Sequence, residues 1–132
     1  MPTAYLTRVV EFTATHRFPD LPDFAGATRD HSHLYKCEGT VRGRFDPTRG
    51  GVMGLKALDA LLKREVVARF DGRHINDDIA AFGAGTWLAT GEGLAVYVWE
   101  RLVEAGLPAG VALHRVRVQE GANLYSEYYG EP

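Results

Sequence analysis

Two long stretches of alternating apolar and polar residues constrain the fold of this chain more than any other feature. From Tyr5 to His16 and from His31 to Phe45, apolar residues or histidines recur at alternate positions. This is the period of a strand with one buried face. Residues 17–30 separate the two runs and are rich in proline, glycine and aspartate, so they form a long loop of the kind that usually has a functional role.

The rest of the chain is expected to contain two helices followed by a hairpin, with no internal repeats. Two adjacent strands, two helices and two further strands predict an α+β fold: an antiparallel sheet with both helices on one face. The strands are long for so short a chain, so their free edges predict an oligomer built by strand pairing. The expected segments are a helix over 52–70, an irregular stretch over 71–85, a helix capped by Thr90 that ends near Gly106, and strands over 111–119 and 124–129.

Length and composition predict one globular domain spanning residues 1–132. The chain is 45% hydrophobic and 24% charged, with a formal net charge of -2, so it has no general attraction for nucleic acid or anionic lipid. Its single cysteine, Cys37, excludes an internal disulfide and favours a reducing compartment. With no signal-like N-terminus and no apolar run of membrane-spanning length, we expect a cytoplasmic protein without nucleic-acid or membrane partners.

Three histidines are the first candidate for chemistry. His16 ends the first strand-like run, and His31 and His33 open the second on a common face. If the two strands pair, the three imidazoles converge, and three neutral imidazoles with an open fourth position are typical of a catalytic zinc site. The alternative is three separate histidines, each with its own local hydrogen bond.

Glu120 is the second candidate, because it continues the apolar face formed by Val116 and Val118. A buried carboxylate needs a partner. That partner is either an internal salt bridge or a ligand that offers a ring N–H beside an amino group, as an arginine does. In the loop after the first helix, Asp71 and His74 are expected to be an ordinary turn residue and an exposed loop histidine, with proton transfer as the alternative role.

Five short motifs occur in one order along the chain. In this order they resemble the 6-pyruvoyl-tetrahydropterin synthase and 6-carboxy-tetrahydropterin synthase family over nearly the whole sequence. The resemblance implies the tunnelling (T) fold, in which trimers close a β-barrel and two trimers stack into a hexamer with active sites between subunits. The motifs are Phe12-x-Ala14-x-His16-Arg17, His31-x-His33-x-Tyr35, Phe70-Asp71-x-x-x-Ile75-Asn76, Thr90-x-Glu92-x-Leu94-Ala95 and Val118-x-Glu120.

The resemblance also implies roles for individual residues. The zinc-binding histidines of the family correspond to His16, His31 and His33, and its pterin-anchoring glutamate corresponds to Glu120. A further pair, Thr90 and Glu92, matches the motif that helps to line the pterin pocket of the neighbouring subunit.

The chain departs from the family at the catalytic Cys–Asp–His triad. Ala27 stands where the cysteine is expected, and Gly72 stands where the histidine is expected, so only Asp71 is left of the triad. His74 lies two residues beyond the expected histidine, and Cys37 lies too far along its strand to replace the missing cysteine. With the triad incomplete, the chain need not retain zinc, so the sequence leaves open whether the three histidines bind a zinc ion.

These features predict a protein that binds a pterin-like ligand at subunit interfaces without the family's triphosphate elimination from dihydroneopterin triphosphate. One alternative is a divergent, zinc-dependent enzyme acting on a pterin or purine-like substrate, with Asp71 or His74 in proton transfer. Another is a structural or regulatory hexamer whose pocket is vestigial.

Overall fold

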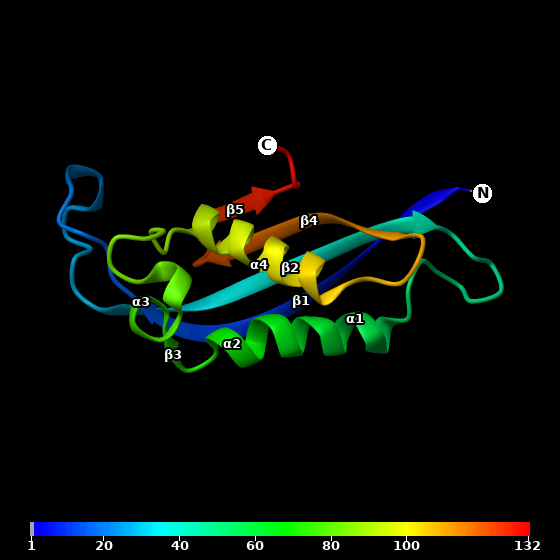
Figure 1. Cartoon of the computed structure of the whole chain (residues 1–132), viewed down its shortest axis with the longest axis horizontal. Helices are drawn as coiled ribbons and strands as arrows, with labels where there is room; N and C mark the ends of the chain where they lie inside the picture. The colour runs from blue at the N-terminus through cyan, green and yellow to red at the C-terminus, as the bar shows by residue number, and fades with distance from the viewer. Residues whose placement is uncertain (1) are drawn as a thin grey trace.

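A five-stranded sheet with helices packed over one face forms the fold (Figure 1). The computed structural model describes residues 2–132, and the strand order is β3-β1-β2-β4-β5. The strands are β1 (Thr3–His16), β2 (His31–Arg44), β3 (Arg73–His74), β4 (Val111–Glu120) and β5 (Tyr125–Tyr128). The helical segments are η1 (Pro22–Phe24), α1 (Leu55–Leu62), η2 (Lys63–Val67), α2 (Ala68–Phe70), α3 (Ile75–Asp78), η3 (Ala80–Phe82) and α4 (Gly91–Ala105).

The pairing of β1 with β2 confirms the interpretation of the two alternating runs. The strands are antiparallel over their full length, from Thr3 opposite Arg44 to His16 opposite His31. Apolar side chains on one face are buried in the core beneath the helices, and the polar ones alternate with them on the other face. The final rung of this ladder therefore brings the first two candidate metal ligands opposite each other.

The first helical segment runs without interruption from α1 through the π-helical η2 to α2. It begins at Leu55, after the cap residue Gly54, rather than at residue 52. Its apolar side chains at four-residue spacing are buried against the sheet. Gly39 on β2 permits this packing, because a Cβ atom there would lie 2.9 Å from Leu62 Cδ2. The buried residues are Leu58, Leu62, Val66 and Phe70.

Helix α4 begins and ends where the sequence predicts. The Thr90 side chain accepts a hydrogen bond from the Gly93 backbone N–H at 3.1 Å, as an N-cap does. Gly106 follows the last turn with a φ of 89°, a conformation that favours glycine. The buried face of α4 packs on β4 and β5, so the start of this helix is fixed beside the end of β4.

The stretch over 71–85, expected to be irregular, contains a short strand and helices. β3 pairs in parallel with the end of β1, which makes the sheet mixed rather than purely antiparallel. Gly72 turns the chain onto β1: its φ is 71°, and its N–H donates to the Thr13 carbonyl at 2.8 Å. This hydrogen bond and the left-handed conformation give Gly72 a structural reason to be glycine.

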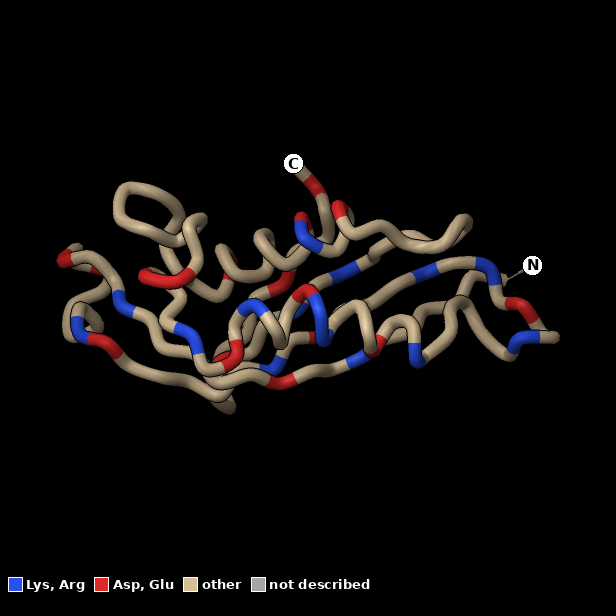
Figure 2. The backbone as a smooth tube through the Cα atoms, turned by 60° about the horizontal axis from the view of Figure 1, so that its bottom comes forward, with Lys and Arg blue, Asp and Glu red and all other residues tan. Residues whose placement is uncertain are grey.

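The sheet face opposite the helices is exposed and mixed in character. Lys and Arg are interspersed with Asp and Glu along the chain (Figure 2), while Tyr5, Val9, Leu34 and Tyr125 expose about half of their surface. β3 covers only the end of β1, so within residues 2–132 the outer edge of β1 before Phe12 pairs with no strand. Within residues 2–132, no helix has the length and apolar character needed to cross a membrane.

Candidate functional site

The three candidate histidines meet at one end of the sheet. His16 and His31 face each other across β1 and β2, and His33 lies on the same face of β2. One ring nitrogen from each lies within 4.8 Å of the other two. The convergence expected from strand pairing is therefore present in the structure, and the cluster has a geometry that could hold a metal ion.

Backbone carbonyls orient two of these rings. His16 Nδ1 donates to the Ala89 carbonyl at 2.9 Å, and His31 Nδ1 donates to the Arg29 carbonyl at 2.8 Å. Each bond places the proton on Nδ1 and leaves the Nε2 lone pair available, which is how metal-ligating histidines are usually held. His16 Nε2 is buried and has no hydrogen-bond partner, and such an atom is costly unless a ligand completes it.

The electrostatic environment keeps His16 neutral. Its pKa is lowered from 6.5 to about 4, mainly by burial and to a smaller extent by the neighbouring His31 and His33, against the opposing hydrogen bond to Ala89. A neutral imidazole is the form that binds metal. The donor set of three imidazoles, one with an unpartnered buried nitrogen, therefore fits zinc.

Glu120 lies next to the histidines at the end of β4. It is paired with Tyr35 in the sheet, its side chain is only 10% exposed, and its Oε2 lies 3.5 Å from His33 Nε2. Burial raises the pKa of this carboxyl, an effect that His33 and His31 oppose and Glu92 reinforces. Within residues 2–132, no arginine or lysine lies at ion-pair distance from Glu120, so its internal partner is a histidine.

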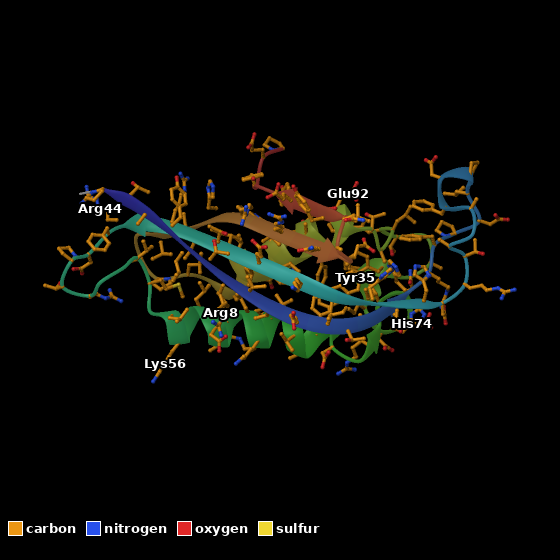
Figure 3. All side chains as sticks on the ribbon, turned by 180° about the vertical axis from the view of Figure 1, so that it is seen from behind. Arg8, Tyr35, Arg44, Lys56, His74 and Glu92 are labelled. Carbon is orange, nitrogen blue, oxygen red and sulfur yellow. The ribbon has the colours of Figure 1, made fainter. Side chains whose placement is uncertain are left out.

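The start of α4 contacts the same carboxylate. A Cβ atom at Gly91 would lie 3.4 Å from Glu120 Oε1 and 2.6 Å from Ser126 Oγ, so the absence of a side chain at Gly91 lets these two side chains lie close to the start of the helix. Thr90 serves as the helix cap, and Glu92 is exposed in the first turn; Figure 3 shows Glu92 and Tyr35 toward the same end of the sheet, away from Arg44. Sequence reasoning missed Gly91, because its closeness to Glu120 and Ser126 arises from tertiary packing that the sequence does not display.

Asp71 has a local structural role in this chain. Its Oδ1 accepts a hydrogen bond from the Thr13 backbone N–H at 3.0 Å, which ties the turn after α2 to β1. In the described part of the chain it makes no hydrogen bond to the histidine cluster. The turn role expected for Asp71 is therefore what the structure shows within one subunit.

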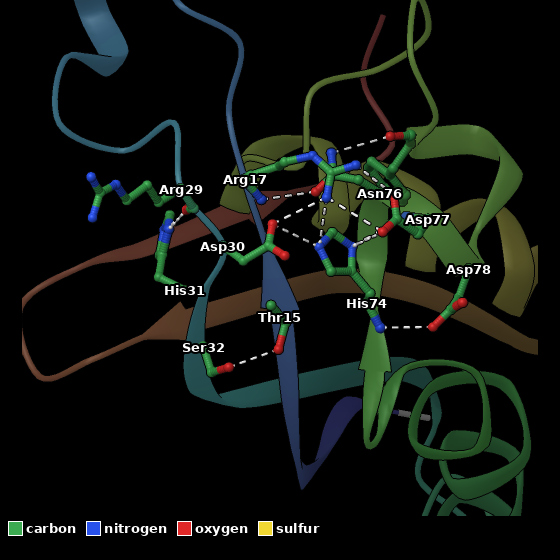
Figure 4. A network of polar contacts seen from close by, with 11 residues as sticks. Thr15, Arg17, Arg29, Asp30, His31, Ser32, His74, Asn76, Asp77 and Asp78 are labelled. Atoms are coloured by element: carbon green, nitrogen blue, oxygen red, sulfur yellow. Dashed lines mark hydrogen bonds and ion pairs between the residues drawn. The ribbon is translucent and has the colours of Figure 1, made fainter.

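His74 belongs to a second group of polar residues, which we call the Arg17 cluster: Arg17, Asp30, His74 and Asp77 (Figure 4). His74 Nδ1 accepts from the Asp77 backbone N–H at 3.2 Å, which leaves Nε2–H to donate to Asp30 Oδ1 at 3.0 Å. Arg17 pairs with both carboxylates of the cluster. The side chain of His74 is 17% exposed, so it is not the exposed loop histidine expected from the sequence, and neither ring nitrogen is free.

Cys37 is a buried core residue, as predicted. It is fully inaccessible in the middle of β2, and burial raises the pKa of its thiol to about 12. Because the thiolate is the nucleophilic form, Cys37 has neither the position nor the ionisation of a catalytic cysteine.

Comparison with known proteins identifies similar sequences and folds over nearly the whole chain. The model of a family described as 6-pyruvoyl tetrahydropterin synthase matches residues 5–131. The 6-pyruvoyl tetrahydrobiopterin synthase of Poecilia reticulata is 33% identical, over 96% of this chain and 90% of the relative. That of Homo sapiens is 32% identical, over 97% and 92%. The structure of Caenorhabditis elegans 6-pyruvoyl tetrahydropterin synthase superposes with a TM-score of 0.85 at 27% identity, covering 99% of this chain and 98% of the other.

Proposed function

This chain belongs to the 6-pyruvoyl tetrahydropterin synthase family and has its T-fold, and from that premise we propose that it binds a pterin-like ligand between subunits without carrying out the standard triphosphate elimination. The observation that carries the proposal is Glu120, a largely buried carboxylate beside three histidines with no arginine or lysine partner in the described chain. A pterin offers a ring N–H next to an amino group, which two carboxylate oxygens can accept in parallel.

The second half of the proposal rests on missing catalytic groups. Positioned acid–base residues contribute about 10²- to 10⁴-fold each, and members of a triad act together. Ala27 and Gly72 offer no such group, while Cys37 is buried in the core and His74 has both ring nitrogens occupied. We therefore expect the family reaction to be absent or very slow.

The histidine cluster fits a zinc ion, with His16, His31 and His33 as its ligands. A zinc ion bound there would polarise an oxygen atom of a bound ligand. The chain's own residues hold the three rings in place: the carbonyls of Ala89 and Arg29 fix two of them, and the β1–β2 ladder sets their spacing.

Self-association is part of the proposal, because one subunit leaves much of the sheet uncovered. The outer edge of β1 is free before Phe12 in the described chain, and apolar residues are exposed on the face opposite the helices. Pairing of such edges between copies would remove them. We propose a homohexamer of two stacked trimers, and light scattering of the purified protein would test it; a stable monomer would contradict this assembly.

Fluorescence titration with neopterin tests ligand binding. We expect saturable binding that Glu120→Gln weakens roughly 10- to 100-fold, because a hydrogen-bonded charged partner is lost. The matched control is Glu104→Gln, which removes an exposed carboxylate on α4. Absence of saturable binding by the wild type would overturn the proposal, and an unchanged affinity in Glu120→Gln would indicate a vestigial pocket instead.

Release of triphosphate from dihydroneopterin triphosphate tests the loss of activity. We expect a negligible rate beside that of an intact relative assayed in parallel. Restoring the two groups in Ala27→Cys/Gly72→His would not restore full activity, because residue 72 has a φ of 71° that a histidine rarely adopts. A wild-type rate comparable with that of the relative would contradict the proposal.

A divergent zinc-dependent enzyme is the second candidate, favoured by the unpartnered His16 Nε2. It would act on a pterin or purine-like substrate, with Asp71 as the one residue of the triad that the chain keeps. Incubating zinc-loaded and metal-free protein with a panel of pterins and purines, followed by chromatography, separates the two candidates. Zinc-dependent product formation would favour the enzyme.

A further inference from the structure

Ser126 is a polar residue on the inward face of the last strand. It lies opposite Val118 in the β4–β5 pair, and residues directly opposite each other in an antiparallel pair share a face of the sheet. Tyr128, two residues later on this face, packs against Trp99 of α4. The Ser126 side chain is half-buried, and within residues 2–132 its hydroxyl takes part in no hydrogen bond. Its O–H is therefore available to a ligand.

The same hydroxyl lies beside the carboxylate of Glu120. Glu120 follows Val118 by two residues on β4, so it shares a face with Ser126. The Glu120 backbone N–H donates to the Leu124 carbonyl at 2.9 Å, which closes the turn and fixes β5 next to the end of β4. The two carboxylate oxygens have different surroundings. Oε2 lies 3.5 Å from His33 Nε2, whereas Oε1 lies toward Ser126 and the start of α4.

Gly91 leaves the position next to both groups unfilled. A Cβ atom at Gly91 would lie 2.6 Å from Ser126 Oγ and 3.4 Å from Glu120 Oε1. The hydroxyl and the carboxylate oxygen therefore approach one point from two different strands. Because residue 91 has no side chain, helix α4 places no atom at that point.

We propose that Ser126 is a second anchoring residue for the ligand, and that its hydroxyl donates to the ring atom next to the edge held by Glu120. This rests on the proposed function, which supplies Glu120 as the first anchor and a pterin-like ring as the ligand. The proposal adds a residue on β5 to a site that was otherwise built from β1, β2, β4 and the start of α4.

The chemistry of the ring explains why a hydroxyl suits this place. Neopterin carries a ring N–H beside an amino group, and a hydrogen-bond acceptor flanks this pair at each end. A carbonyl oxygen follows the ring N–H, and a ring nitrogen follows the amino group. Whichever of the two donors meets Glu120 Oε1, the next ring position is an acceptor, and Ser126 is the neighbour that can donate to it.

Fluorescence titration of neopterin into the wild type and Ser126→Ala tests the second anchor. Loss of a neutral hydrogen bond should weaken binding roughly 3- to 10-fold. The urea midpoint should not fall, because the hydroxyl has no partner within residues 2–132 to lose. Thr48→Ala is the matched control: it removes a hydroxyl from the turn after β2, at the other end of the sheet, and should bind neopterin as the wild type does.

Pterin without the side chain of neopterin gives the second measurement. Because Ser126 is proposed to contact the ring edge, Ser126→Ala should weaken binding of both compounds by the same factor. A loss for neopterin alone would overturn the proposal, since the hydroxyl would then contact the ligand's side chain. A lower urea midpoint in Ser126→Ala, or an equal loss of affinity in Thr48→Ala, would also overturn it.

Failure of this inference can be told apart from failure of the proposed function. Unchanged affinity in Ser126→Ala beside weakened binding in Glu120→Gln would remove Ser126 from the site and leave the proposed function standing. Absence of saturable binding of either compound by the wild type would contradict the proposed function itself.

Discussion

Two polar clusters lie at the same end of the sheet, and they differ in whether their atoms have partners. In the histidine cluster, His16 Nε2 is buried without a partner and Glu120 faces only His33. In the Arg17 cluster, both nitrogens of His74 and both carboxylates are engaged within the chain. The clusters are adjacent in sequence, since Arg17 follows His16 and Asp30 precedes His31.

This difference separates a site that can accept a ligand from one that supports it. Satisfied groups need nothing from outside the chain, whereas unsatisfied buried groups are stabilised by whatever completes them. The histidine cluster therefore has the chemistry of a binding site. The Arg17 cluster holds the loop ends next to that site and joins them to α3.

The largest effect should come from removing a ring of the histidine cluster. We expect His16→Ala to weaken zinc binding well over 100-fold, because loss of a ligand should exceed the 10- to 100-fold cost of changes around the ligands. Metal analysis and chelator competition measure this. His114→Ala is the control, since His114 packs between Tyr5 and Tyr129 and should leave zinc binding unchanged. Equal losses in both variants would show that the cluster is not the metal site.

Acid should destabilise the metal-free protein through His16. Burial lowers its pKa from 6.5 to about 4 in the folded state, so the unfolded chain binds more protons between these values. The His16 contribution to the free energy of unfolding should therefore fall as pH decreases from about 6.5 to about 4, by on the order of 3 kcal/mol. Urea unfolding across this range measures it. In His16→Leu that contribution should disappear; an unchanged slope would mean that other groups cause it.

A smaller effect is expected in the Arg17 cluster. His74→Ala removes the side chain that caps α3 and a contact to the half-exposed Asp30. Because exposed ion pairs contribute little, we expect a loss of about 1–2 kcal/mol in stability, mostly from the cap. Thermal unfolding measures it, with zinc affinity falling less than tenfold. A loss of zinc binding as large as that of His16→Ala would erase the distinction between the clusters.

The smallest effect is expected at Gly91, which lies beside Glu120 at the start of α4. A Cβ atom there meets Ser126 Oγ at 2.6 Å and Glu120 Oε1 at 3.4 Å, and the serine side chain can move. Gly91→Ala should weaken neopterin binding a few-fold by shifting Glu120, while zinc affinity stays the same. Gly93→Ala is unsuitable as a control because a Cβ atom there would lie 2.6 Å from a backbone oxygen. Gly51→Ala is the better comparison, because Gly51 has open space around it and no positive φ.

The sequence predicts the parts of this molecule that follow from periodicity. The long alternating runs, the helical spacing and the Thr90 cap give the strands and helices nearly as they stand, and the same alternation brings the three histidines together. The sequence could not predict β3 or α3, because a two-residue strand and a single helical turn are too short to show a period. The contacts of His74 with Asp30 and of His33 with Glu120 could not be predicted either, because each joins residues that are distant in the chain.

The unbroken ladder between β1 and β2 links correct strand register to the assembly of the histidine cluster. His16 meets His31 only on the last of its rungs. A slip of one residue would turn His16 to the other face, and a slip of two would carry it about 7 Å along the strand. Molecules with a shifted register therefore do not bring the three imidazoles together. Zinc binding would then distinguish molecules in which β1 and β2 are paired in the native register.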